Sequence, residues 1–357
     1  MNSRIENLRA VLNTKNLDAC IITGRPNTIY FSGFTGSTSY MLVGLDKAWL
    51  IVDFRYTIQA KEQVSEEIEV VEIKDTFYST INSILKKHPV RNIGFEGRVL
   101  PYFEYTKLKG ALTNAKELIG LDGDIDKIRQ IKDSGEAKML QKAALIGDKV
   151  FSHIIDFIKP GMKETEVSTE LEYTMKKLGA KGPSFETIVG SGHRSAMCHG
   201  TATENVLKKG DALVMDFGVI YQNYCSDMTR TIFIGEPSEE LKEIYGIVLE
   251  AQKAALDGIV SGMSGIKADK IARDIIAKAG YGDNFGHSLG HGVGIEIHED
   301  PRLSTSSMDI LKDGMVFSIE PGIYVDGLGG VRIEDMVMLV DGKLRNFTTS
   351  PKDIIII

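Results

Sequence analysis

The stretch DALVMDFGV, residues 211–219, is followed after a short polar turn by CSDMTRTIFI, residues 225–234. Both stretches are rich in apolar and β-branched residues, and together they predict a β-hairpin. We expect a register in which Asp216 faces Asp227, with Cβ atoms about 4.5 to 5.5 Å apart. Two buried carboxylates at that separation repel each other unless a cation neutralises them or one stays protonated. The alternative at this hairpin alone is a pair of solvated aspartates, because exposed acids are common on strands.

A second hairpin candidate repeats the pattern. Glu320 ends a predicted strand within MVFSIEPGIY, residues 315–324, and Glu334 lies on the returning strand within GGVRIEDMVM, residues 329–338. If both hairpins form, they bring four acids towards one site. An acidic protein with unrelated strand acids would need all these positions to coincide by chance.

Histidines complete the candidate site. Of the seven histidines in the chain, five lie in its second half: His193, His199, His287, His291 and His298. The segment GHSLGHGVG, residues 286–294, places glycines beside His287 and His291, so the backbone can approach a ligand closely. A single histidine there would more often be structural, but two in a glycine-rich segment, followed by His298, favour a functional role.

The residue types suggest a metal centre. A ligand set of four acids and one imidazole carries four negative charges, which two divalent cations would balance: Asp216, Asp227, His291, Glu320 and Glu334. Such carboxylate-rich sets are typical of two-metal sites. Four hard oxygen donors favour manganese, iron or cobalt over zinc, which prefers sites richer in histidine and cysteine.

With these residues in place, the sequence resembles the metallo-aminopeptidases of the pita-bread fold, in particular Xaa-Pro aminopeptidases and Xaa-Pro dipeptidases (prolidases). The first third adds NTIYFSGF, residues 27–34, and VDFRY, residues 52–56, which resemble the creatinase-type amino-terminal domain of that group. The resemblance implies a small creatinase-like α/β domain over residues 1–125. It implies a pita-bread catalytic domain, of the α/β and α+β classes, over residues 126–357.

The resemblance also implies roles for the site residues. The five ligands would bind two divalent ions, with manganese expected first and cobalt, iron or zinc as alternatives, and a hydroxide bridging the ions would be the nucleophile. Glu320 would also shuttle the proton, and Arg332 would support the ligands. His199, His287 and His298 would line the substrate pocket, with His287 or His298 donating to the developing oxyanion. The family often reads Pro-His-Gly where this chain has cysteine before His199, which affects packing there.

Local patterns predict an α/β domain followed by an α+β domain with antiparallel hairpins, with the boundary near residues 121–132. In the first third, we expect strands at residues 18–23, 40–45, 48–53, 68–73 and 92–96, and helices at residues 5–14, 56–65, 76–87 and 102–109. Beyond the boundary, we expect a long helix ending at residue 158, helices at 165–178, 239–261 and 266–279, and strands at 315–320 and 331–340.

Composition limits the partners. The chain of 357 residues has 42 Lys and Arg against 49 Asp and Glu, a formal net charge of −7, so nucleic acid is a poor partner. The start lacks a basic segment followed by an apolar one, and no apolar run approaches about 18 residues, so we expect neither secretion nor a membrane span. Three cysteines without CxxC spacing suggest a reducing, cytoplasmic setting. The resemblance implies a homodimer.

The leading hypothesis is a dinuclear exopeptidase that removes the residue before a proline from dipeptides or short peptides. Three alternatives on the same fold stay open: a methionine aminopeptidase-like enzyme, a metal-free amidinohydrolase and a catalytically silent binding protein. Residues 235–316 leave little length for an added lid. We therefore expect the carboxyl side of the proline pocket to be partly open.

Overall fold

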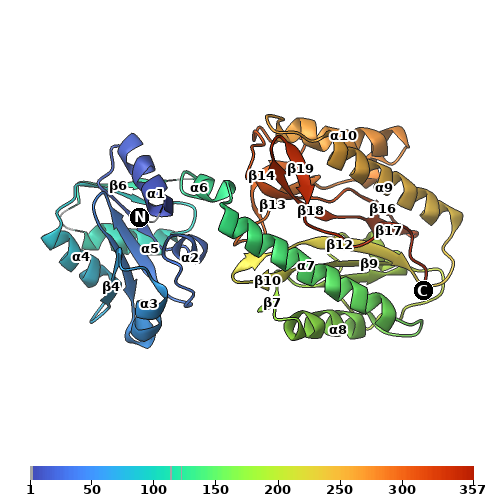
Figure 1. Ribbon diagram of the computed structural model, residues 1–357, viewed down its shortest axis with the longest axis horizontal. Helices are drawn as coiled ribbons and strands as arrows, with labels where there is room; N and C mark the ends of the chain where they lie inside the picture. Colours follow the sequence, from blue (N-terminus) through green and yellow to red (C-terminus); the bar gives the residue numbers. More distant parts are fainter. Residues whose placement is uncertain (1–2, 113–114, 122) are drawn as a thin grey trace. The chain divides into compact units, whose positions relative to one another are not determined.

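The computed structural model describes residues 3–112, 115–121 and 123–357. The chain divides into two compact units, Met1–Arg129 and Gln130–Ile357 (Figure 1). Each unit has its own cluster of buried apolar side chains. Within the described ranges, no helix is both long enough and apolar enough to cross a bilayer.

The first unit is built on a six-stranded mixed sheet of strand order β4-β3-β2-β1-β5-β6. Its strands are β1 (Ala19–Ile22), β2 (Tyr40–Gly44), β3 (Ala48–Val52), β4 (Ile68–Glu72), β5 (Asn92–Phe95) and β6 (Glu117–Gly120). Its helices are α1 (Ser3–Thr14), α2 (Arg25–Ser32), the 3₁₀ turn η1 (Phe54–Tyr56), α3 (Thr57–Gln63), α4 (Phe77–Lys87) and α5 (Tyr102–Ala111), and α6 (Asp126–Gln130) runs across the boundary.

The five strands and four helices predicted for this unit are confirmed to within two residues at each end. The helix α2 and the strand β6 were not predicted, nor were the short turn η1 and the short helix α6 as separate elements. All residues of α2 from Asn27 to Ser32 are buried, so this helix lacks the polar face that makes an amphipathic pattern visible. The strand β6 is only four residues long and lies at the edge of the sheet.

The second unit packs two pairs of helices against antiparallel sheets. The helices are α7 (Ser134–Phe157), α8 (Glu164–Lys177), α9 (Glu239–Gly258) and α10 (Gly265–Lys278), with 3₁₀ turns η2 (Gly192–Ala196) and η3 (Gly282–Asn284). The strands are β7 (Gly182–Pro183), β8 (Ile188–Ser191), β9 (Ala212–Phe217), β10 (Val219–Tyr221), β11 (Tyr224–Cys225), β12 (Met228–Phe233), β13 (Gly290–Gly292), β14 (Glu299–Leu303), β15 (Val316–Ile319), β16 (Gly322–Val325), β17 (Gly329–Arg332), β18 (Asp335–Val340) and β19 (Lys343–Asn346).

Each helix pair packs on one side of this unit (Figure 1). Helices α7 and α8 bury apolar residues against the sheet β12-β9-β8, and α9 and α10 do so against the sheet β14-β13-β15-β18-β19. Helix α7 begins after Asp133, whose carboxylate accepts hydrogen bonds from the backbone N–H groups of Gly135 and Glu136. The candidate site therefore lies on these two sheets, and a helix pair packs against each of them.

The register predicted for the first hairpin is wrong. Asp216 pairs with Thr229 and not with Asp227. The turn contains only Gln222 and Asn223, which both have positive φ, 50° and 68°. Two central residues of this kind are typical of a tight type I′ turn, which shifts the pairing by two residues from the one expected.

Both hairpins are interrupted, and three of the four acids lie at the interruptions, whereas Asp216 lies within β9. In the first, the ladders β10–β11 and β9–β12 are separated at Gly218 on one strand and at Ser226 and Asp227 on the other. In the second, the ladders β16–β17 and β15–β18 are separated at Glu320 and Glu334. The single strand predicted over residues 331–340 is therefore two strands, because the backbone leaves the ladder at the acid.

Gly218 is required by the close approach of two segments at the first interruption. A Cβ added at this position would lie 1.8 Å from the carbonyl oxygen of Ser226 and 2.2 Å from Oγ of Ser184. Since the first of these is a backbone atom, the contact cannot be relieved by a rotamer change. A side chain at Gly218 would push apart the strands that carry the acids.

Gly218→Ala should therefore destabilise the protein. We expect the free energy of unfolding to fall by about 2 to 3 kcal/mol, the cost of overpacking a buried site. Gly246→Ala is the matched control, because Gly246 lies exposed on α9 with no atom within 4 Å of an added Cβ. That variant should be more stable than the parent by about 0.5 to 1 kcal/mol. Urea unfolding measures both changes, and equal stability of the two variants would contradict the packing argument.

Candidate metal centre and substrate cavity

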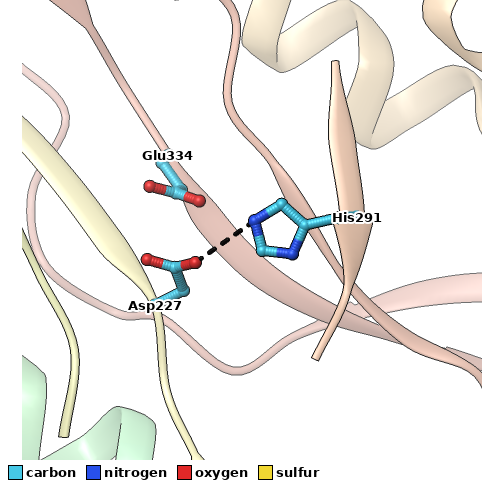
Figure 2. Close-up of side chains that lie close together, drawn as sticks. All are labelled: Asp227, His291 and Glu334. Carbon is cyan, nitrogen blue, oxygen red and sulfur yellow. Dashed lines mark ion pairs between the residues drawn. The ribbon is translucent and has the colours of Figure 1, made fainter. Parts of the chain in front are cut away.

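Three buried side chains from separate segments meet in the second unit. Asp227, His291 and Glu334 each offer one ligand atom, and these atoms lie within 4.8 Å of one another (Figure 2). Asp227 precedes β12, His291 lies on β13, and Glu334 precedes β18. The two hairpin interruptions and the glycine-rich segment thus bring one ligand atom each to the same point.

The imidazole of His291 is oriented as a metal ligand. Its Nδ1 lies 3.1 Å from the carbonyl oxygen of Gly292 and donates to it, which leaves an unprotonated Nε2 on the neutral ring. Burial lowers the pKa of His291 to about 3, so the ring is neutral at physiological pH. Nε2 faces Oδ2 of Asp227 at 3.5 Å and Oε1 of Glu320 at 3.4 Å. A lone pair and two carboxylate oxygens in this arrangement repel one another unless a cation or a carboxyl proton lies between them.

Three acids of the site, Asp227, Glu320 and Glu334, have pKa values above those of ordinary carboxyl groups. Burial, together with the other carboxylates, raises the pKa values of Asp227 and Glu334 well above their ordinary range. Burial also raises the pKa of Glu320 to about 8, although Arg332 lowers it in part. Without a bound cation these shifts favour the protonated carboxyl groups, whereas a cation would favour their ionised forms.

Two carboxylate oxygens are left without a partner. Oδ1 of Asp216 and Oε1 of Glu334 are buried, and neither accepts a hydrogen bond from any described residue. An unsatisfied buried carboxylate oxygen is costly unless it coordinates a metal. The donor set of four carboxylates and one imidazole therefore fits divalent cations with a preference for oxygen ligands.

Arg332 links the acids of the two hairpins. Its Nη2 donates to Oδ2 of Asp216 at 2.6 Å, its Nε to Oγ1 of Thr229 at 2.9 Å, and its Nη1 to the hydroxyl of Tyr324 at 2.7 Å. The hydroxyl of Thr229 in turn donates to Oε2 of Glu334 at 2.7 Å. The observed register explains this contact, because it places Thr229 and not Asp227 opposite Asp216.

Both ring nitrogens of His287 already form hydrogen bonds within the protein. Its Nδ1 lies 2.8 Å from the carbonyl oxygen of Ser288, and its Nε2 lies 2.9 Å from the hydroxyl of Tyr324. Burial lowers the pKa of His287 to about 4, so Nε2 accepts from Tyr324 while Nδ1 donates to Ser288. Neither ring nitrogen of His287 is therefore free to donate to a ligand in this arrangement. The sequence carried no signal for Tyr324, whose role depends on contacts across strands.

All nine predicted site residues line one cavity of about 410 Å³: Asp216, Asp227, His291, Glu320, Glu334, His199, His287, His298 and Arg332. The ring of His298 lies edge-on to that of His291, with 4.3 Å between centroids, and burial lowers its pKa. His199 is exposed. Neither His199 nor His298 has a hydrogen-bond partner among the described residues, so both can donate to a ligand. The sequence did not indicate two further charged residues of the lining, Glu186 and Arg302.

A buried acid holds the loop that carries His199. Glu164, the first residue of α8, accepts hydrogen bonds from the backbone N–H groups of Ser191 and Thr203 at 2.8 and 3.0 Å, and from Nε of Arg194 at 3.1 Å. Burial alone would raise the pKa of Glu164, but hydrogen bonds from Thr203 and Ser191 outweigh it and hold the pKa low. The loop around His199 is thus anchored at both ends by one ionised side chain.

Comparisons with known proteins match both units. Residues 4–131 match the creatinase/prolidase N-terminal domain, and residues 138–341 match metallopeptidase family M24. The chain is 40% identical over 356 residues to the Xaa-Pro dipeptidase of Pyrococcus horikoshii, which is 99% of each chain.

Solved structures agree with these matches. The chain is similar to an Xaa-Pro dipeptidase from Bacillus anthracis, with a TM-score of 0.97 and 44% identity over 99% of both chains. It is also similar to an X-Pro aminopeptidase from Thermotoga maritima MSB8, with a TM-score of 0.91 and 40% identity over 96% of this chain and 98% of that chain. One of these two proteins is named a dipeptidase and the other an aminopeptidase.

The raised carboxylate pKa values predict how stability depends on pH. When chelator is present, the folded protein holds protons on Glu320 that the unfolded chain releases, so stability is full at low pH and is lost as pH rises through about 8. Between pH 6 and 9 we expect a loss of roughly 2 to 3 kcal/mol, seen as a falling Tm. Saturating Mn²⁺ should remove most of this slope, because a bound cation favours the ionised carboxylates.

Asp227→Asn provides the control, since it removes one of the repelling carboxylates without changing side-chain size. In chelator at pH 9, the variant should melt at a higher temperature than the parent protein. A Tm of the chelated parent protein that does not fall from pH 6 to pH 9 would show that repulsion among the carboxylates does not limit stability.

Proposed function

Because this chain belongs to metallopeptidase family M24 and carries a creatinase/prolidase amino-terminal domain, we propose that it hydrolyses the bond between a first residue and a proline in second position. The chain is a hydrolase, and its substrates are dipeptides and short peptides. Relatives named for Xaa-Pro or X-Pro substrates favour this activity over a methionine aminopeptidase-like one. Retention of all five candidate ligands disfavours both a silent binding protein and a metal-free enzyme.

The observation that carries the proposal is the convergence of Asp227, Glu320 and Glu334 on His291, in a cavity that Asp216 also lines. Asp216, Asp227, His291, Glu320 and Glu334 would hold two divalent ions, whose four positive charges balance the acids. When bound, such ions supply an activated water nucleophile near neutral pH and polarise the scissile carbonyl. We propose manganese first, with cobalt, iron or zinc as alternatives.

The side chains around the acids would handle the protons and the substrate. Glu320 is the most accessible of the four carboxylates, with 16% of its side chain exposed, so it is placed to take a proton from the attacking water and deliver it to the leaving nitrogen. His298 and His199 would donate hydrogen bonds to the carbonyl oxygen as negative charge develops on it. Arg332 would keep Asp216 oriented.

Arg302 would bind the far end of a dipeptide. It pairs directly with His291 in the β13–β14 ladder, so both side chains lie on the same face of the sheet. Arg302 is exposed, lines the cavity, and its guanidinium has no partner among the described residues. A guanidinium can bind a carboxylate with two parallel hydrogen bonds, which is what a proline carboxylate requires. We therefore propose a preference for dipeptides, with a side open enough to admit tripeptides.

We propose the cellular compartment and the oligomeric state on other grounds. Cys20, Cys198 and Cys225 are free thiols, as expected of a protein that works in the reducing cytoplasm. The dimeric state is proposed from the family resemblance alone, and light scattering at micromolar concentration would measure it directly.

Peptide hydrolysis under saturating Mn²⁺ tests the proposed function. We expect kcat/KM for Ala-Pro to exceed that for Ala-Ala by at least about tenfold, since the proline ring fills its pocket. Amidation of the Ala-Pro carboxylate should lower kcat/KM by about tenfold, the value of one charged hydrogen bond. Arg302→Gln should remove the effect of amidation, whereas Arg345→Gln, which alters an exposed arginine on β19 outside the cavity, should leave it intact.

Two results would count against this function. A preference for Ala-Ala over Ala-Pro would reject proline specificity. An amidation effect that survives in Arg302→Gln would reject Arg302 as the carboxylate anchor while leaving the peptidase assignment in place.

A further inference from the structure

The cavity carries one free negative charge away from the acid cluster. Glu186 lines the cavity, is exposed, and has no hydrogen-bond or ion-pair partner among the residues that the structure describes. The four clustered acids would be neutralised by the metal ions, and Arg332 is paired with Asp216. Glu186 and Arg302 are therefore the two charges that a bound peptide can still neutralise.

These two charges lie on opposite edges of the joined sheets. Glu186 comes two residues before Ile188, the first residue of β8, which is the edge strand of the sheet β12-β9-β8 and pairs Ile188 with Asp216 on β9. Arg302 lies on β14, the edge strand of the five-stranded sheet. The sheets meet near β12 and β18, where the backbone N–H of Glu334 donates to the carbonyl oxygen of Thr229 (Figure 1). A peptide held at the acid cluster thus has Arg302 on one wall and Glu186 on the other.

The wall around Glu186 suits a long cationic side chain. Phe185 and Ile188 line the cavity on either side of Glu186 in sequence and offer apolar contact. Lysine and arginine pack their methylene stems along apolar surface while their charged heads stay in water. If Arg302 holds the proline carboxylate, the side chain of the preceding residue points towards this opposite wall.

The free amino group of the substrate is a poorer match for Glu186. It is separated from the scissile carbonyl carbon by one Cα atom, a distance of about 2.5 Å, so it must lie beside the buried acids. Glu186 lies at the exposed rim and not among those acids. A lysine ammonium lies about 6 Å from its own Cα and can reach the rim.

We propose that Glu186 makes the enzyme select lysine or arginine as the residue before proline. This selection rests on the proposed Xaa-Pro activity and adds a substrate class to it. The interaction is an exposed ion pair, so its effect is a preference of a few fold and not an absolute requirement.

Lys-Pro and norleucine-Pro form a matched substrate pair for the test, because they differ mainly by the terminal ammonium. With the Mn²⁺-loaded full-length protein at low salt, we expect kcat/KM for Lys-Pro to exceed that for norleucine-Pro by about three- to fivefold. Glu186→Gln should bring this ratio to about one by lowering kcat/KM for Lys-Pro more than for norleucine-Pro or Ala-Pro. Glu250→Gln, on the exposed face of α9, makes the same charge change outside the cavity and should leave the ratio as in the parent protein.

A charge reversal gives a second readout. Glu186→Lys should prefer Glu-Pro over Gln-Pro, which the parent protein should not do. The proposal is overturned if Glu186→Gln keeps the preference for Lys-Pro. It is also overturned if this variant cleaves all three substrates equally more slowly, because that result would assign Glu186 to binding of the free amino group or to folding. Failure of the parent protein to cleave any Xaa-Pro dipeptide would instead reject the proposed function.

Discussion

Repulsion among four carboxylates, three of them buried, is the constraint on which the catalytic unit depends. Asp216, Asp227, Glu320 and Glu334 are carried by two hairpins whose interruptions leave these side chains close together in a cavity. The surrounding polar groups satisfy only some of their oxygens, and two buried oxygens keep no partner among the described residues. Divalent cations would resolve both problems at once, since they would neutralise the charge and take the unpaired oxygens as ligands.

The remaining parts of the unit position this cluster or surround it. Helix pairs hold each sheet from outside, and Arg332 connects the acids of one hairpin to those of the other through Asp216 and Thr229. The histidine loop depends on a separate anchor, the buried carboxylate of Glu164. The candidate ligands therefore lie within strands or directly beside them, while a hydrogen-bonded loop carries His199, which is proposed to contact the substrate.

The sequence alone predicted the fold class, and the family matches and solved structures confirm a creatinase-like α/β domain followed by a pita-bread metallopeptidase domain. It also predicted residues that line one cavity, because an ionisable acid within an apolar strand is costly to bury unless a cation or a proton neutralises it. The register could not be predicted, since it depends on φ values at Gln222 and Asn223. Contacts made across strands, such as those of Tyr324 and Arg302, leave no pattern along the chain. Such residues become visible only when the strands are in place.

Metal stoichiometry is the decisive test of the dinuclear centre. The protein would be dialysed to equilibrium against a saturating concentration of Mn²⁺ and the bound metal counted by mass spectrometry. We predict two ions per chain for the parent protein and fewer for Asp227→Asn at unchanged secondary structure. Absence of bound metal from the parent protein would contradict the role given to the four carboxylates, and one ion per chain that survives in Asp227→Asn would reject the dinuclear centre.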